Sequence, residues 1–158
     1  SLVENNVKEI IKKIYSEADN NKCKILIPED FNVSKDFNGK SVTKDENNID
    51  NDDIILDIGP KTLQRVEEII KTSKTVMWNG PAGYFENINF AKGTNSLAKI
   101  ISDYTSKKSL LSIVGGGDTI SAINKSKMSL SFTHLSTAGG AFLEYLEGKD
   151  LPGITVLK

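Results

Sequence analysis

Residues 112–123 read SIVGGGDTISAI, which places three consecutive glycines and an aspartate between two apolar stretches. Glycine loses more conformational entropy on folding than any other residue and adds no side-chain packing, so three in a row need a structural reason. The apolar residues before the glycines predict a strand over 109–114, and those after them predict a helix over 118–124. The stretch therefore predicts a turn that leads from the carboxyl end of a strand directly into a helix.

A second stretch repeats this pattern later in the chain. Residues 136–146 read STAGGAFLEYL, again a strand end, glycines and a predicted helix over 140–146. Gly117 and Gly140 are 140 − 117 = 23 residues apart, a length that fits one helix plus one strand. In a parallel sheet the two helix N-termini would open at the same edge, where ligands of such sheets bind.

The remaining periodicities extend the strand–helix alternation along the whole chain. The predicted helices cover residue 2 to about 15–18, a segment beginning at Pro60, and 93–105. The predicted strands are CKILIPED (23–30), IILDIGP (54–60), TVMWNG (75–80), LSFTHLST (130–137) and ITVL (154–157), with the polar stretch 38–53 as a surface loop or loose hairpin. This order predicts an α/β protein with a Rossmann-like parallel sheet and helices on both faces.

The glycine turn has chemistry that suits phosphate. A helix N-terminus presents unpaired N–H groups and a partial positive charge, and Gly116 and Gly117 remove the Cβ atoms that would hold a phosphate away. Asp118 would repel a phosphate unless a divalent cation lay between them, so it is a candidate Mg²⁺ ligand, and the Thr119 hydroxyl is a candidate donor. The alternatives are a tight strand-to-helix turn without a ligand and an ordinary capping role for Asp118.

Composition excludes several other classes. The chain has 158 residues, which fits one domain, and a formal net charge of −1 with Arg65 as the single arginine, so we expect no nucleic-acid partner. No apolar run approaches the ~18 residues that a membrane span needs, so we expect no membrane partner either. Cys23 cannot form an internal disulfide, which suits a reducing cytoplasm, and we expect it to pack within its strand.

Two common nucleotide motifs are absent. A G-x-G-x-x-G fingerprint would need glycine at position 120, where isoleucine stands, so an NAD-dependent oxidoreductase is disfavoured. The Gly39-Lys40-Ser41 sequence lacks the first glycine of a P-loop because Ser34 occupies that position.

Several longer motifs follow one another along the chain: ILIPEDF (25–31), LDIGPKT (56–62), TVMWNGPAGYFE (75–86), FAKGT (90–94), GGGDT (115–119) and LEYLEGKDLPG (143–153). In sequence and in order, these motifs resemble those of phosphoglycerate kinases. The resemblance implies a glycolytic kinase that transfers a phosphoryl group reversibly between 1,3-bisphosphoglycerate and ADP. It implies two Rossmann-like domains in a cytoplasmic monomer, the N-terminal one binding 3-phosphoglycerate and the C-terminal one binding Mg-ADP or Mg-ATP.

These 158 residues resemble only the later part of the C-terminal domain. The resemblance implies that 1–158 is a partial nucleotide-binding domain, that the N-terminal domain is absent, and that this chain is inactive by itself. The alternative is a nucleotide-binding module without catalysis.

The resemblance also assigns roles to individual positions. It implies that Gly116, Gly117, Asp118 and Thr119 hold the nucleotide phosphates, with Asp118 as the metal ligand, and that Gly117 and Gly140 present backbone amides to the transferred phosphoryl group. Ala138 stands where the family has a further glycine, and we expect its methyl group to be tolerated.

Four further positions take binding roles from the same resemblance. Glu86 would bind the ribose hydroxyls, Asn79 would lie near the phosphates, and Phe37 and Leu56 would flank the adenine. Read without the resemblance, Glu86 is a surface acid, Asn79 a turn residue, and Phe37 and Leu56 core residues. Ile55 stands where many family members have glycine, which would narrow the adenine site.

Overall fold

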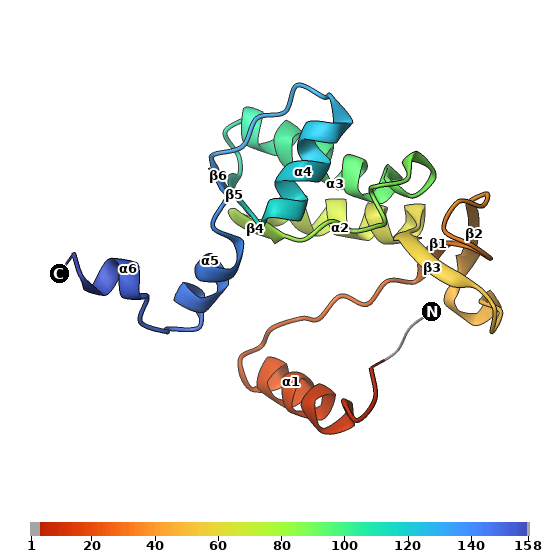
Figure 1. Cartoon of the computed structure of the whole chain (residues 1–158), viewed down its shortest axis with the longest axis horizontal. Coiled ribbons are helices and arrows are strands. Elements are labelled where there is room, and N and C mark those ends of the chain that lie inside the picture. Colours follow the sequence, from red (N-terminus) through yellow and green to blue (C-terminus); the bar gives the residue numbers. More distant parts are fainter. Residues whose placement is uncertain (1–3, 158) are drawn as a thin grey trace.

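The computed structural model describes residues 4–157 (Figure 1). Its elements follow in chain order: α1 (Lys8–Asn20), β1 (Asp30–Ser34), β2 (Val42–Asp45), β3 (Ile54–Ile58), α2 (Pro60–Thr72), β4 (Thr75–Asn79), α3 (Lys92–Ser106), β5 (Leu111–Gly115), α4 (Gly117–Ser126), β6 (His134–Ser136), α5 (Gly139–Leu146) and α6 (Pro152–Thr155), with short 3-10 turns at Glu46–Asn48 and Ile88–Phe90. The predicted α/β class is confirmed.

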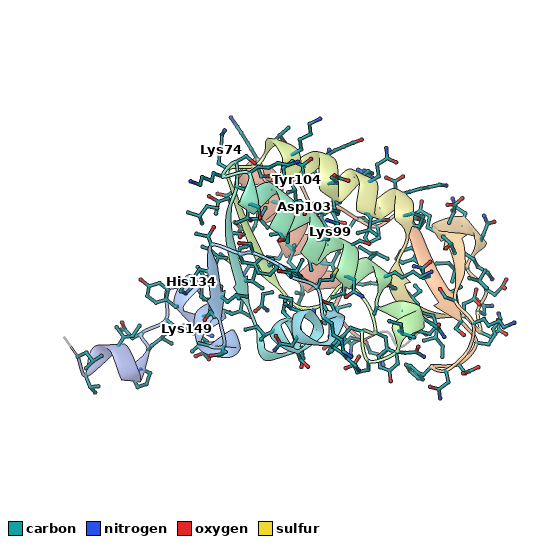
Figure 2. All side chains as sticks on the ribbon, turned by 90° about the horizontal axis from the view of Figure 1, so that it is seen from above. Lys74, Lys99, Asp103, Tyr104, His134 and Lys149 are labelled. Atoms are coloured by element: carbon teal, nitrogen blue, oxygen red, sulfur yellow. The ribbon has the colours of Figure 1, made fainter. Side chains whose placement is uncertain are left out.

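A parallel sheet forms the centre of the second half. Its strand order is β4-β5-β6, and both pairings are parallel, as the strand–helix alternation predicted. Asn79 pairs with Gly115, and Gly115 pairs with Ser136, so three strands end together at one edge. Figure 2 labels Lys74, which directly precedes β4 and therefore marks the opposite, amino edge of the sheet.

The main core lies between this sheet and two helices. Trp78 and Val114 point from the sheet into a cluster with Ile70 of α2 and Ile101 of α3. The Trp78 indole N–H also donates to the Gly80 carbonyl at 2.6 Å, which satisfies its polar atom. Trp78 is therefore a packing residue.

The opposite face of the parallel sheet is less covered. Phe142 of α5 reaches it at the carboxyl edge, where a Cβ on Gly115 would lie 3.2 Å from the Phe142 ring. Further from that edge, Met77 and Leu111 are each 45% exposed. One helix thus reaches the second face, α5 through Phe142 at the carboxyl edge, and the rest of that face keeps an apolar area open to solvent.

A separate antiparallel sheet precedes the parallel one. Its order is β2-β1-β3, and β1 pairs antiparallel with both neighbours. The polar stretch 38–53 contains β2 and returns toward β3, so it contains a paired strand. Lys44 and Lys35 both contact the buried Asp53 and hold the pKa of its carboxyl well below the usual range.

Buried aspartates join these strands to the following helices. The Asp30 carboxylate accepts the N–H groups of Lys61 at 2.9 Å and Thr62 at 2.8 Å, in the first turn of α2. Burial alone would raise the pKa of Asp30, but the bonds from Thr62 and Lys61 outweigh it and lower the pKa. A negative charge at a helix N-terminus is also favoured by the helix dipole.

Three local predictions are wrong. Residues 23–28 form an extended segment, not a strand, because within the described residues no neighbouring strand pairs with it, and Cys23 at its start is exposed. Ile154 and Thr155 lie in the short helix α6 instead of a last strand, since Pro152 begins a helical turn there.

The first helix also differs from its prediction. It begins at Lys8, and the predicted start at Leu2 and Val3 lies outside the described residues. Ile10, Ile11 and Ile14 are exposed, and α1 stands apart from the two sheets (Figure 1). Among residues 4–157, no helix combines the length and apolar character needed to cross a bilayer.

Candidate functional site

The carboxyl edge of the parallel sheet brings Asn79 to the glycine turn. Asn79 ends β4 beside Gly115, and a Cβ on Gly116 would lie 2.9 Å from the Asn79 side-chain oxygen. Gly116 has a φ of +96°, a conformation that side-chain-bearing residues rarely adopt. The backbone angle therefore favours glycine at position 116, and a Cβ there would also displace the Asn79 side chain.

The N-termini of α4 and α5 meet at this edge. A Cβ on Gly139 would lie 3.0 Å from the Gly116 Cα and 3.7 Å from the Gly117 nitrogen, so the two glycine turns are in contact. A Cβ on Gly117 or Gly140 would meet no other atom within 4 Å, which means that both positions face open space. The prediction that two glycine-lined helix N-termini open on the same edge is confirmed.

This pair of turns has the chemistry of an anion site. The first N–H groups of each helix have no acceptor within their own helix, and the two helix dipoles add partial positive charge at the same place. Asp118 is the second residue of α4 and is exposed, while the N-cap position is Gly116. Asp118 is therefore not the N-cap, and it is an exposed acidic residue in the first turn of α4.

The Thr119 side chain points into the protein and not toward the open edge. It is fully buried, and its Oγ1 accepts the Gly80 N–H at 2.7 Å. The hydroxyl thus ties the segment after β4 to α4, and a phosphate at this edge would meet the Thr119 backbone instead of its side chain.

Phe37 and Leu56 come together around one loop, residues 80–87. The Tyr84 N–H donates to the Leu56 carbonyl at 2.7 Å, and the Tyr84 ring meets the Phe37 ring edge-on with centroids 5.5 Å apart. Asn87 donates to the Phe37 carbonyl at 2.8 Å. Leu56 is buried, whereas Phe37 is 51% exposed and offers an aromatic surface.

Tyr84 is a residue that the sequence reasoning did not single out. It lies two positions before Glu86 within the TVMWNGPAGYFE motif, and that position was its only available signal. Its backbone and ring link both predicted adenine-flanking residues to the same loop.

Glu86, in the same loop, contacts α4. It is exposed, its carbonyl accepts from Lys125 Nζ of α4 at 3.0 Å, and it lines a cavity of about 140 Å³ with Phe85 and Ala122. Among the described residues, no hydrogen bond joins the Glu86 carboxylate to another predicted site residue. Loop 80–87 therefore carries Glu86 and Tyr84 at one end and begins beside Asn79 at the other.

These features define an α/β protein with a candidate anion site where two helix N-termini meet at the carboxyl edge of a parallel sheet. Residues 1–149 match the family described as phosphoglycerate kinase. The chain belongs to the phosphoglycerate kinase family, and the resemblance read from its motifs is confirmed.

Individual relatives agree over nearly the whole chain. The phosphoglycerate kinase of Wolbachia pipientis wMel is 45% identical over 161 residues, and that of Zymomonas mobilis strain ZM4 is 44% identical over 160 residues. The solved phosphoglycerate kinase from Coxiella burnetii superposes with a TM-score of 0.89 at 35% identity, and that from Pyrococcus horikoshii OT3 with 0.75 at 32%. In all four comparisons, 99–100% of this chain matches 40% of the relative's length.

Proposed function

We propose that this chain is part of a phosphoglycerate kinase, which transfers a phosphoryl group reversibly between 1,3-bisphosphoglycerate and ADP and gives 3-phosphoglycerate and ATP. The contact between Gly139 and Gly116 carries the proposal, because it brings two helix N-termini to one point. Phosphoryl transfer depends mainly on positioning and on neutralising charge, which such a point supplies. Residues 1–158 would be part of a C-terminal nucleotide-binding domain, and the phosphoglycerate substrate would bind in an N-terminal domain.

The described side chains suggest how a nucleotide lies. The phosphates would meet the N–H groups of Gly117 and Gly140, with Asn79 beside them and Thr119 contributing through its backbone. The exposed Phe37 ring and the Leu56 edge would flank the adenine, and Glu86 would bind the ribose hydroxyls.

Asp118 fits a magnesium ion. Asp118 is an exposed acid in the first turn of α4, the turn whose N–H groups would attract phosphate oxygens, and Mg²⁺ binds through one or two carboxylates plus substrate phosphates. When bound, Mg²⁺ would neutralise phosphate charge during transfer. Asp118 would hold it, and the open backbone at Gly117 and Gly140 would orient the phosphoryl group.

Calorimetric titration of the full-length protein tests this proposal. We expect Mg-ADP to bind, and Asp118→Asn to weaken binding about tenfold or more while removing most of its magnesium dependence. Glu144→Gln, an exposed acid on α5, is the matched control and should leave affinity unchanged. Absence of Mg-ADP binding by the wild-type protein, or a preference for NAD, would contradict the proposal.

Turnover separates the enzyme from a module that binds nucleotide without catalysis. We propose that the full-length protein turns over 1,3-bisphosphoglycerate in a coupled assay as a cytoplasmic, glycolytic monomer with no nucleic-acid or membrane partner. A polypeptide of these 158 residues alone should show no turnover, since it spans 40% of its relatives' length. Normal turnover by the 158 residues would overturn the division into domains, and none by the full-length protein would favour the binding module.

A further inference from the structure

Loop 80–87 joins the two ends of the candidate site and is held at several points. Its first residue, Gly80, donates to Thr119 of α4, and Tyr84 donates to Leu56 of β3. Asn87 at its end donates to Phe37. The positions of Asn79 and Glu86 relative to one another therefore depend on the path of this loop.

Thr94 fixes the middle of the loop. It is the third residue of α3, is 1% exposed, and accepts two backbone hydrogen bonds through Oγ1. The donors are the Ala82 N–H at 3.0 Å and the Gly83 N–H at 3.1 Å. One hydroxyl oxygen thus sets the position of two consecutive peptide groups.

Asp57 of β3 holds the backbone next to Thr94. It is 2% exposed and accepts the N–H of Gly93, the residue before Thr94, at 2.7 Å. A Cβ on Gly83 would lie 2.3 Å from Asp57 Oδ1 and 2.5 Å from the Phe90 carbonyl oxygen, so the loop backbone is pressed against this carboxylate. The neighbouring residue Leu56 carries the carbonyl that receives Tyr84.

We propose that Thr94 is a positioning residue for nucleotide binding, which holds loop 80–87 in its binding geometry before any ligand arrives. This inference rests on the proposed function. Its physical basis is preorganisation: a loop that is already fixed loses less conformational entropy when a ligand binds. Thr94 itself is buried and its hydroxyl oxygen accepts from the loop backbone, so it would act through the loop.

The chain contains a matched control for this role. Thr62 is also the third residue of its helix, α2, is 3% exposed, and also accepts two backbone N–H groups through Oγ1. Those donors are the N–H groups of Glu29 at 3.0 Å and Asp30 at 3.3 Å, which lie just before and at the start of β1 and not in loop 80–87. Thr62→Val and Thr94→Val therefore remove the same kind of acceptor from the same helix position, and Thr62→Val also removes a hydroxyl that donates to the buried Asp30 carboxylate at 2.7 Å.

The experiment measures Mg-ADP affinity and the unfolding midpoint on the same full-length preparations. We expect both valine variants to lose stability, because each leaves two N–H groups without their acceptor, and Thr62→Val should lose at least as much as Thr94→Val, because it also removes a donor to the Asp30 carboxylate. Thr94→Val should weaken Mg-ADP binding by about tenfold, Thr94→Ser should return it to within about twofold of wild type, and Thr62→Val should bind like wild type.

The outcomes separate this inference from the proposed function. Wild-type protein that fails to bind Mg-ADP would overturn the proposed function. Two results would overturn only the role of Thr94, provided that the wild-type protein binds Mg-ADP. One is a Thr94→Val variant with the Mg-ADP affinity of the wild type, and the other is an equal loss of Mg-ADP affinity in Thr94→Val and Thr62→Val.

A second measurement needs no variant and covers the case in which Thr94→Val does not fold. The Ala82 and Gly83 amides of nucleotide-free wild-type protein should exchange hydrogen slowly, as a preformed loop requires. Exchange as fast as in an unstructured peptide would overturn the inference.

Discussion

Asp57 carries a buried charge whose cost depends on pH. Burial raises its pKa to about 6 from 3.8, although the Gly93 and Ile58 N–H groups and Asn32 partly offset this. The folded protein then binds a proton between about pH 6 and 4 that the unfolded chain does not, so the contribution of Asp57 to stability falls as pH rises through this window.

The Asp57→Asn variant isolates this contribution. The difference in unfolding free energy between wild type and variant should change by up to about 3 kcal/mol between pH 4 and pH 7, in favour of the wild type at low pH. Asp50 and Asp53 have lowered pKa values, so their contributions to stability fall as pH falls. Both residues are present in wild type and variant, so these contributions cancel in the difference in unfolding free energy. A difference that stays flat across this range would show that the pKa of Asp57 is the same in the folded and the unfolded protein.

Gly139 and Gly140 are adjacent and should respond oppositely to alanine. At Gly139 the new Cβ would lie 3.0 Å from the Gly116 Cα, so the two glycine turns must separate and stability should fall. At Gly140 the methyl group meets nothing within 4 Å, and replacing a helical glycine by alanine typically adds about 0.5–1 kcal/mol of stability.

Nucleotide binding distinguishes the two positions further. Gly140→Ala should fold at least as well as wild type yet bind Mg-ADP about tenfold more weakly, because its methyl group occupies the space proposed for phosphate. Urea denaturation and calorimetry on the same samples measure both effects. Wild-type affinity in Gly140→Ala would place the phosphates elsewhere.

Some features of the candidate site could be predicted from the sequence alone, and others could not. Both glycine turns were predictable because strand, glycine and helix signals lie next to one another in the chain. Thr94, Asp57 and Tyr84 were missed because their roles arise only when loop 80–87 folds back onto α3 and β3. Tertiary contacts of that kind leave no periodic pattern in the sequence.

Errors in the strand predictions have a related cause. Residues 23–28 and 154–157 are rich in β-branched or aliphatic residues, but a strand also needs a hydrogen-bonded neighbour, and the described structure provides none at either place. In β2 the reverse holds: Val42 and Thr43 are exposed in a polar stretch, and only pairing with β1 makes a strand of it.

Helix α1 should be much less stable than α3 in a 158-residue polypeptide. It has 13 residues, of which none is buried, and isolated helices shorter than about 12–15 residues are marginal in water. Hydrogen exchange followed by mass spectrometry should therefore show α1 exchanging far faster than α3, which buries Ile101 and Ala98. Equal protection of the two helices would mean that α1 packs on the rest of the molecule.

At the scale of the whole molecule, the described residues leave apolar side chains open to solvent in several places, and two of these lie on regular elements far apart in the chain. One is the face of α1 that carries Ile10, Ile11 and Ile14, and the other is the part of the parallel sheet around Met77 and Leu111. Monomeric proteins rarely leave large apolar patches uncovered. Because the relatives are two and a half times as long as the matched region, we expect further parts of the longer protein to cover these surfaces.

The 158-residue polypeptide should then self-associate where the full-length protein does not. Sedimentation velocity at increasing concentration should show growing oligomers, and the double variant Met77→Lys/Leu111→Lys should shift the distribution toward monomer by placing charge on the open sheet face. Ile88→Lys is the control, since Ile88 is 77% exposed in the turn Ile88–Phe90, away from the strands of that sheet. A wild-type polypeptide that stays monomeric at all concentrations would mean that these surfaces need no cover. Loss of association in the Ile88 variant alone would place the contact on the loop side of the molecule.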